Sequence, residues 1–228
     1  MSRIARTVTR FLDLTPDSTL AIDLSDEGLA AAVRSLAGSA GATEPADGPV
    51  QRGLVDLEGP PAPLVPDRVK QLVERVAPGG TVVAVIHQPG DGNSNELAAQ
   101  IGPCLDLSEV NAEREGLVLI LRGRRRKALT KTRIKELRGL GHAIEASVLV
   151  GRQGLTPEIV AATLAALERH GLVKAKLTPQ CELDKESASR DLAWATGSKL
   201  LQRIGKTALL YRPDVKLEPP VTHRRGGR

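Results

Sequence analysis

The alternation of apolar and polar positions predicts much of the secondary structure in the second half of this chain. Residues 172–177 place apolar side chains on one face and Lys174 and Lys176 on the other, which is the period of a half-buried strand. Residues 157–170 instead repeat apolar positions at helical spacing, and Gly171 follows them as a C-terminal cap. We therefore expect a capped helix directly followed by a strand.

The same patterns extend to either side of this pair. A helix is expected from Lys131 to about Glu145, with Thr130 as its N-cap and a basic stripe opposite its apolar positions. The other elements of this half are expected as strands at 147–150, 199–204 and 207–211 and as a helix at 184–195.

In the first half, strands and helices are expected to alternate, which favours an open α/β sheet. The strands are expected at 19–23, 50–57, 81–86 and 116–121, and the helices at 26–37, 66–76 and 94–101. We interpret this half as a reduced, Rossmann-like module. The fold class predicted for the whole chain is α/β.

The most informative short motif is the loop Gly151-Arg152-Gln153-Gly154, which joins a predicted strand to the helix that starts at Thr156-Pro157. Glycines at both ends let a phosphodiester backbone approach the amides of such a loop. The free N–H groups and the dipole at the start of the helix also favour phosphate. The loop is thus a candidate clamp for nucleic acid, and the alternative is an ordinary turn between strand and helix.

Further motifs surround the loop in a recognisable order. They are Leu129-Thr130, Arg133, Leu137-Arg138, Leu140, His142, Val148, Val150-Gly151, Gly154-Leu155, Leu172–Lys176, Thr196-Gly197, Ile204–Thr207 and Leu210–Pro213. Together they resemble the CRM domain (chloroplast RNA splicing and ribosome maturation), in particular the small bacterial YhbY-type proteins, over about residues 127–216. The resemblance implies a compact α/β RNA-binding fold with a four-stranded sheet. It also implies association with precursor large ribosomal subunits.

Charge divides the chain in the same way. Residues 1–121 hold 9 Lys and Arg against 17 Asp and Glu, a net of −8, whereas residues 122–228 have a net of +13. An acidic module next to a basic one suggests that only the second suits a polyanion. We expect an acidic module at 1–121, a basic linker at 122–127, the CRM-like domain at 128–214 and a disordered basic tail at 215–228. The linker is either a flexible cationic clamp or simply solvated.

Only one Trp, one Tyr and one Phe occur in the chain, so stacking of bases on aromatic platforms is not expected. Binding should depend on phosphate contacts and shape. The candidate RNA-binding residues are Gly151, Arg152, Gln153 and Gly154 of the loop, Lys131, Lys135 and Arg138 of the first helix, and Lys174, Lys176, Lys206 and Arg212 of the sheet.

Two segments of the first half stand out: residues 20–25, a strand that ends in Asp23, and residues 72–83, which contain a Pro-Gly-Gly turn before a later strand. They weakly resemble parts of class I methyltransferases, in which the acidic end of the first of these strands holds the cofactor ribose. An S-adenosylmethionine-dependent RNA methyltransferase is therefore the alternative function. A glycine-rich cofactor loop should precede the strand that ends in Asp23, but residues 11–18 contain no glycine. We therefore favour a module without catalysis or cofactor, which could dock a protein partner.

Cysteine spacing and hydropathy limit which class of protein this chain can belong to. Cys104 and Cys181 lie far apart and show no metal-ligand spacing, so two isolated thiols are expected. No apolar run is long enough to span a bilayer, and no signal-peptide core stands near the start. We expect a cytoplasmic protein that binds ribosomal RNA and no membrane.

Overall fold

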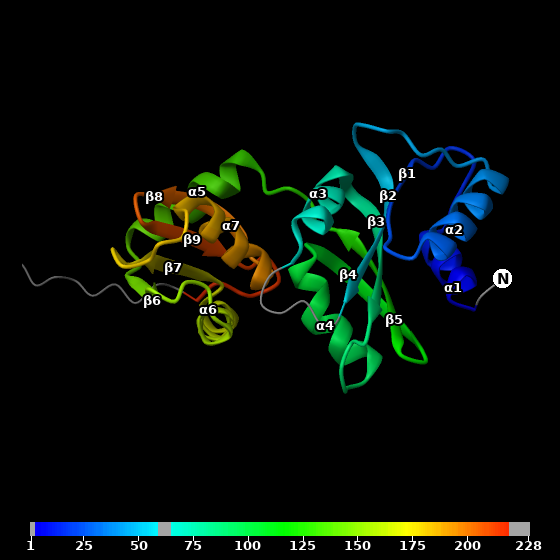
Figure 1. The fold of residues 1–228 in the computed structure, drawn as a ribbon. Helices are drawn as coiled ribbons and strands as arrows, with labels where there is room; N and C mark the ends of the chain where they lie inside the picture. The colour runs from blue at the N-terminus through cyan, green and yellow to red at the C-terminus, as the bar shows by residue number, and fades with distance from the viewer. Residues whose placement is uncertain (1–2, 59–64, 219–228) are drawn as a thin grey trace, which may run out of the picture. The chain divides into compact units, whose positions relative to one another are not determined.

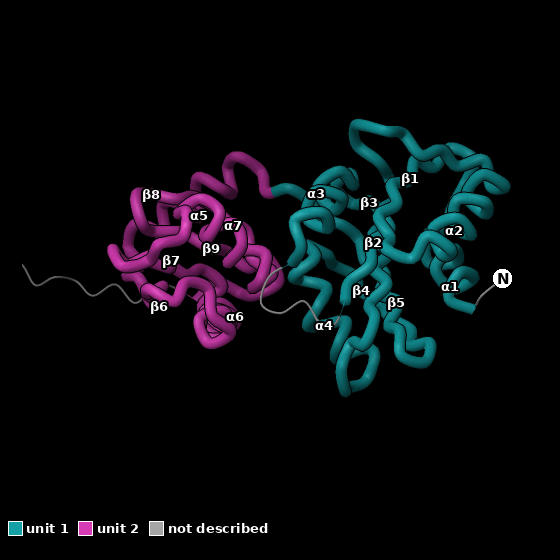
Figure 2. Tube along the Cα trace, in the orientation of Figure 1, with its two compact units in different colours: residues 1–128 teal, residues 129–228 magenta. Residues whose placement is uncertain are grey.

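The computed structural model describes residues 3–58 and 65–218, and the chain forms two compact units, Met1–Ala128 and Leu129–Arg228 (Figure 2). Each unit builds a sheet of its own, with five strands in the first and four in the second. Both sheets are open and contain parallel and antiparallel pairs. The predicted α/β class is therefore confirmed.

The first unit alternates helices with strands along most of its length. Its elements are α1 (Arg3–Leu12), β1 (Leu20–Asp23), α2 (Glu27–Ser39), β2 (Val50–Glu58), α3 (Asp67–Arg75), β3 (Val76–His87), α4 (Ser94–Cys104), β4 (Leu107–Glu115) and β5 (Val118–Arg125). The sheet order is β1-β2-β3-β5-β4, in which β1, β2 and β3 are parallel and the β3–β5 and β5–β4 pairs are antiparallel.

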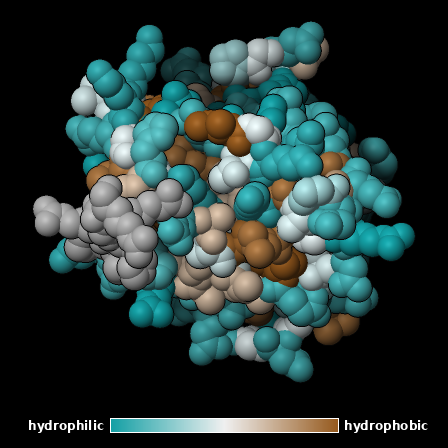
Figure 3. All heavy atoms as spheres, turned by 90° about the vertical axis from the view of Figure 1, so that its left-hand side faces the viewer, coloured by the Kyte–Doolittle hydropathy of each residue, from teal (hydrophilic) through white to brown (hydrophobic). Residues whose placement is uncertain are grey.

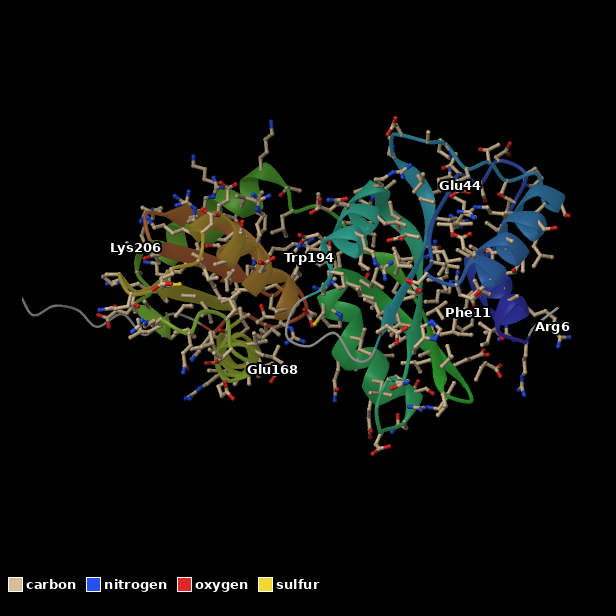
Figure 4. The ribbon with its side chains drawn as sticks, viewed as in Figure 1. Arg6, Phe11, Glu44, Glu168, Trp194 and Lys206 are labelled. Carbon is tan, nitrogen blue, oxygen red and sulfur yellow. The ribbon has the colours of Figure 1, made fainter. Side chains whose placement is uncertain are left out.

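Helices cover both faces of this sheet, with α1 and α2 on one side and α3 and α4 on the other (Figure 1). Val8 and Phe11 of α1 and Val33 of α2 join a buried cluster with Leu54 and Val83 of the strands. Arg6 of α1 points away from this cluster into solvent (Figure 4). Burial of these apolar side chains, rather than local propensity, holds the short α1 in place.

The basic run expected as a linker at 122–127 belongs largely to a strand. Arg122 to Arg125 form the end of β5, where Arg124 donates to the Thr81 hydroxyl at 2.9 Å. Arg125 donates to the backbone carbonyls of Glu74 and Val76. These guanidinium groups bind the first unit itself, so the expectation of a linker was wrong for 122–125.

The second unit repeats the α/β plan on a smaller scale. Its elements are α5 (Lys131–His142), β6 (Ala146–Val150), α6 (Pro157–His170), β7 (Leu172–Leu177), α7 (Lys185–Ala195), β8 (Lys199–Ile204) and β9 (Thr207–Tyr211). The sheet order is β6-β7-β9-β8, with β6 and β7 parallel and the other two pairs antiparallel. These elements match the predicted ones closely, although α5 ends at His142 rather than near Glu145.

The two faces of this sheet have separate cores. Val173 and Ala175 of β7 pack with Leu167 of α6 and Leu192 of α7 on one face. On the other face, Leu137 of α5 packs in a smaller cluster formed by Leu172, Leu201, Leu209 and Tyr211 of the strands. Within residues 129–218 a single helix, α5, thus covers the second face, and part of that face stays accessible.

Some of the residues after β9 pack against the second unit. Leu217 packs against the cluster under α5, and the Val215 N–H donates to the Arg212 carbonyl at 3.3 Å. The start of the tail expected to be disordered at 215–228 is therefore packed as far as Leu217. Residues 219–228, with the Arg-rich end of that tail, lie outside the described residues.

Candidate nucleic-acid interface

The glycine loop lies where β6 ends and α6 begins, as the sequence predicts. The Gly154 N–H donates to the Gly151 carbonyl at 3.1 Å and closes a tight turn. Arg152 and Gln153, at the tip of this turn, are both exposed. The loop therefore presents one cation and one amide to solvent in front of a helix N-terminus, which is a favourable arrangement for phosphate.

The two glycines of the loop have different surroundings. A Cβ at Gly151 would meet nothing within 4 Å, so a ligand backbone can come close there. Gly154 instead has a φ of +71°, and a Cβ there would lie 2.7 Å from Cδ1 of Leu183. Gly151 is thus the open end of the loop, whereas Gly154 is required by the turn and its packing.

The start of α6 carries both a cap and a negative charge. The Thr156 hydroxyl accepts a hydrogen bond from the Ile159 N–H at 3.4 Å, as expected for an N-cap. A hydrogen bond from the same hydroxyl lowers the pKa of Glu158, so this exposed carboxyl is ionised at neutral pH. Glu158 therefore offsets part of the attraction that the helix N-terminus exerts on phosphate.

Two lysines of the predicted set lie at the same end of the sheet as the loop. The Leu177 N–H donates to the Lys206 carbonyl at 2.7 Å, and the Thr178 N–H donates to the Val150 carbonyl at 2.9 Å. These bonds place the Gly205-Lys206 turn and the base of the loop beside the end of β7, which carries Lys176. Lys206 is labelled in Figure 4.

The basic stripe of α5 lies over the accessible face of the sheet. Lys131, Lys135 and His142 are exposed, whereas Gly141 is buried, and a Cβ there would come within 2.5 Å of Leu209. Arg138 is fixed in place, since its Nε and Nη2 donate to the Leu201 carbonyl at 3.0 and 2.7 Å. The stripe is therefore presented to solvent as predicted, with one of its members held rigidly.

Arg212 lies at the opposite end of the sheet from the loop. It follows Tyr211, which pairs with Leu172 at the start of β7, whereas the loop adjoins the end of β7. Its guanidinium is 10% exposed and lies 3.4 Å from Glu168 and 3.2 Å from Asp214. Arg212 thus connects β9 to α6, and we leave it out of the candidate surface.

The structure adds two apolar residues that charge patterns could not reveal. Leu149 of β6 and Ile204 of β8 are each 58% exposed. The strand register places them at the two ends of one row across the sheet, with Lys176 and Thr207 between them. Figure 3 shows exposed apolar residues among hydrophilic ones on the face that it presents. In the sequence, only the alternation of Leu149 with its neighbours Val148 and Val150, which are buried, could have indicated that Leu149 lies on the exposed face of the strand.

Two classes of site are absent from the part of the chain that the structure describes. No group of three or more His, Cys, Asp or Glu side chains is arranged to hold a metal ion among residues 3–58 and 65–218. Within the same ranges, no helix combines the length and the apolar character needed to cross a bilayer.

Comparison of the first unit with solved structures gives only distant similarity. An RNA methyltransferase from Salinibacter ruber is 11% identical, with a TM-score of 0.30 over 57% of this chain and 96% of that chain. The similarity of the first half to methyltransferase folds is distant, and it carries no functional argument.

The second unit has much clearer relatives. The model of the CRS1 / YhbY (CRM) domain matches residues 129–212. The Pseudomonas aeruginosa "Probable RNA-binding protein PA4753" is 35% identical over 89 residues, which are 39% of this chain and 86% of the relative. The "RNA-binding protein" of Haemophilus influenzae is 31% identical over 86 residues, which are 37% of this chain and 87% of the relative. Through its second unit, this chain belongs to the CRS1/YhbY (CRM) domain family.

Proposed function

We propose that this protein binds RNA through its second unit and that its target is ribosomal RNA during assembly of the large subunit. The family model matches residues of this unit, and the relatives named as RNA-binding proteins match stretches of similar length, 37–39% of the chain. The large subunit is proposed because the YhbY-type proteins that the motifs resemble associate with its precursors. The chain has two cysteines that lie far apart in the sequence, Cys104 and Cys181, which fits a cytoplasmic site of action.

One observation carries the proposal. Arg152, Lys176 and Lys206 gather around one end of the sheet, and none of them forms an ion pair among the described residues. Cations without carboxylate partners can neutralise phosphates and release counterions. The open Gly151 beside them gives a phosphate access to the loop amides. Phosphate contacts should therefore supply most of the affinity.

The alternative function, methylation of RNA, has less support from the first unit. The element before β1 is the helix α1, and the connection between them contains no glycine. Asp23, which stands where class I methyltransferases hold the cofactor ribose, lies 3.0 Å from Arg68, which also pairs with buried Asp56. We therefore propose that this unit is not an enzyme.

A salt titration of RNA binding by the full chain tests the proposal. Affinity should fall steeply with salt, and Arg152→Ala should lower the slope by about 0.7–0.9, the value for one phosphate contact. Arg169→Ala is the matched control, because Arg169 is exposed at the other end of α6. Glu158→Gln should act in the opposite direction and tighten binding, because it removes a charge that repels phosphate.

Two results would contradict RNA binding through this surface: an affinity that does not depend on salt, or equal effects of Arg152→Ala and Arg169→Ala. The ribosomal part of the proposal has its own test. The parent protein should sediment with precursors of the large subunit, and Arg152→Ala should weaken that association. Sedimentation with the small subunit instead would overturn this assignment.

A further inference from the structure

A pocket opens on the accessible face of the second unit's sheet, beside α5. Its volume is about 180 Å³, and its lining comes from the end of α5 and from β7, β8 and β9. Leu209 and Gly141 contribute apolar surface, and exposed Ile204 also lines it. The pocket therefore combines an apolar interior with an opening to solvent.

Among the described residues, the polar part of the lining contains cations and hydrogen-bonding groups but no carboxylate. Lys174 pairs with Leu209 across β7 and β9, and Leu209 pairs in turn with Gln202 of β8, so this row brings a cation and an amide to the pocket. Thr207 adds a hydroxyl from the next row. Such a set can satisfy the edge of a heterocycle, since an amide and a hydroxyl both donate and accept hydrogen bonds.

Arg138 gives the pocket a flat cation at its side. Two hydrogen bonds to the Leu201 carbonyl hold its guanidinium, so little conformational entropy is lost when a ligand contacts it. Guanidinium planes stack on bases as aromatic rings do. This residue can thus supply the stacking surface that a chain with one Trp, one Tyr and one Phe otherwise lacks.

The position and size of the pocket further limit the kind of ligand that it can bind. Thr207, which lines it, pairs with Lys176, and Lys176 lies at the end of β7 that adjoins the loop. At about 180 Å³ the pocket is smaller than the roughly 300–1,000 Å³ typical of sites for whole drug-sized ligands. A single ring system is therefore a better fit than a complete dinucleotide cofactor.

We propose that this pocket accepts one unpaired nucleobase of the RNA whose phosphates contact the loop. The inference rests on the proposed function and adds a site for a base to a surface that otherwise contacts phosphates. Apolar contact with Leu209, stacking on Arg138 and hydrogen bonds to Gln202 and Thr207 hold the base. Lys174 neutralises an adjacent phosphate.

The test compares oligouridine RNA with an oligomer of equal length in which abasic riboses replace the nucleotides. Both carry the same phosphates, so only contacts to bases distinguish them. The full-length parent should bind the base-containing strand about tenfold more tightly. Gln202→Leu should reduce this ratio, because it removes the amide while conserving most of the volume. Ile204→Trp should also reduce it, since a large side chain at this exposed position covers the opening.

Gln180→Leu is the matched control, because it removes an exposed amide that lies outside the pocket and outside the glycine loop. It should leave the ratio between the two strands unchanged. The proposal is overturned if the parent binds both strands equally, or if Gln180→Leu and Gln202→Leu lower the ratio alike. In either case a steep salt dependence would still support RNA binding through the loop, so the two ideas fail separately.

A terminal phosphate is the other ligand that these cations could hold. Oligouridine with and without a 5′-phosphate distinguishes the two sources of affinity. We expect the two oligomers to bind the parent protein with equal affinity. A preference for the phosphorylated strand that Arg138→Gln abolishes, together with equal binding of abasic and base-containing strands, would assign the pocket to phosphate and overturn the proposal.

Discussion

Single residues explain why the loop has two glycines. Sequence alone treats Gly151 and Gly154 as equivalent points of close approach, because a backbone angle is not visible in a sequence. In the structure only Gly154 has a positive φ, and only Gly154 has Leu183 against its α-carbon. The loop and its neighbouring elements were therefore predictable, whereas the division of roles between the glycines was not.

This division predicts opposite outcomes for two substitutions. Gly151→Asp should fold like the parent but weaken RNA binding, because it places a carboxylate where phosphate approaches. Gly154→Ala should destabilise the second unit by about 1–2 kcal/mol, the usual cost of a left-handed conformation for a residue with a side chain. Fluorescence of the chain's one tryptophan, Trp194 of α7, follows unfolding of this unit (Figure 4).

Binding and unfolding must be measured on both variants. If Gly151→Asp binds RNA as the parent does while remaining folded, the loop is only a turn. The RNA surface would then lie along the α5 stripe instead.

At the scale of elements, periodicity succeeded where the apolar positions are regular and buried. It missed β4, whose segment Leu107–Glu115 is mostly polar because it forms the edge of its sheet. It also missed α1, although Val8 and Phe11 have helical spacing and are buried. The pocket beside α5 was beyond prediction, because it arises from the register of three strands and the placement of one helix.

The cap of α7 predicts a dependence of stability on pH. The Asp184 carboxylate accepts a hydrogen bond from the Ser187 N–H at 2.8 Å, and this bond lowers the pKa of Asp184 below its ordinary value of 3.8. A carboxyl whose pKa is depressed by folding stabilises the fold above its ordinary pKa. That contribution should be lost as the pH falls through the lower pKa of the folded state.

Asp184→Asn keeps a capping side chain but removes the titration. Urea unfolding followed by Trp194 should show a steeper loss of stability for the parent than for this variant as the pH is lowered below about 4. Parallel losses in the two proteins would mean that other carboxyl groups determine the acid response.

At the scale of the whole molecule, charge indicated two modules, and the structure moves the boundary between them. Arg122 to Arg125 belong to β5, and Arg126 and Lys127 also fall in the first unit, so residues 1–128 have a net charge of −3 and the second unit has +8. The asymmetry persists but is smaller than a division at residue 121 suggests. The placement of these arginines depends on β5 pairing with β3, which sets Arg124 opposite Thr81 and which the sequence pattern did not show.

The first unit provides the last prediction, which concerns cofactor binding. Asp23 and Asp56 share Arg68, and no glycine-rich cradle precedes β1, so the full chain should not bind S-adenosylmethionine at micromolar concentration. Isothermal titration calorimetry on the parent and on Asp23→Ala measures this directly. Micromolar binding by the parent that Asp23→Ala abolishes would show that the carboxylate exchanges Arg68 for a ribose. The methyltransferase alternative would then replace the proposal that this unit has no catalytic role.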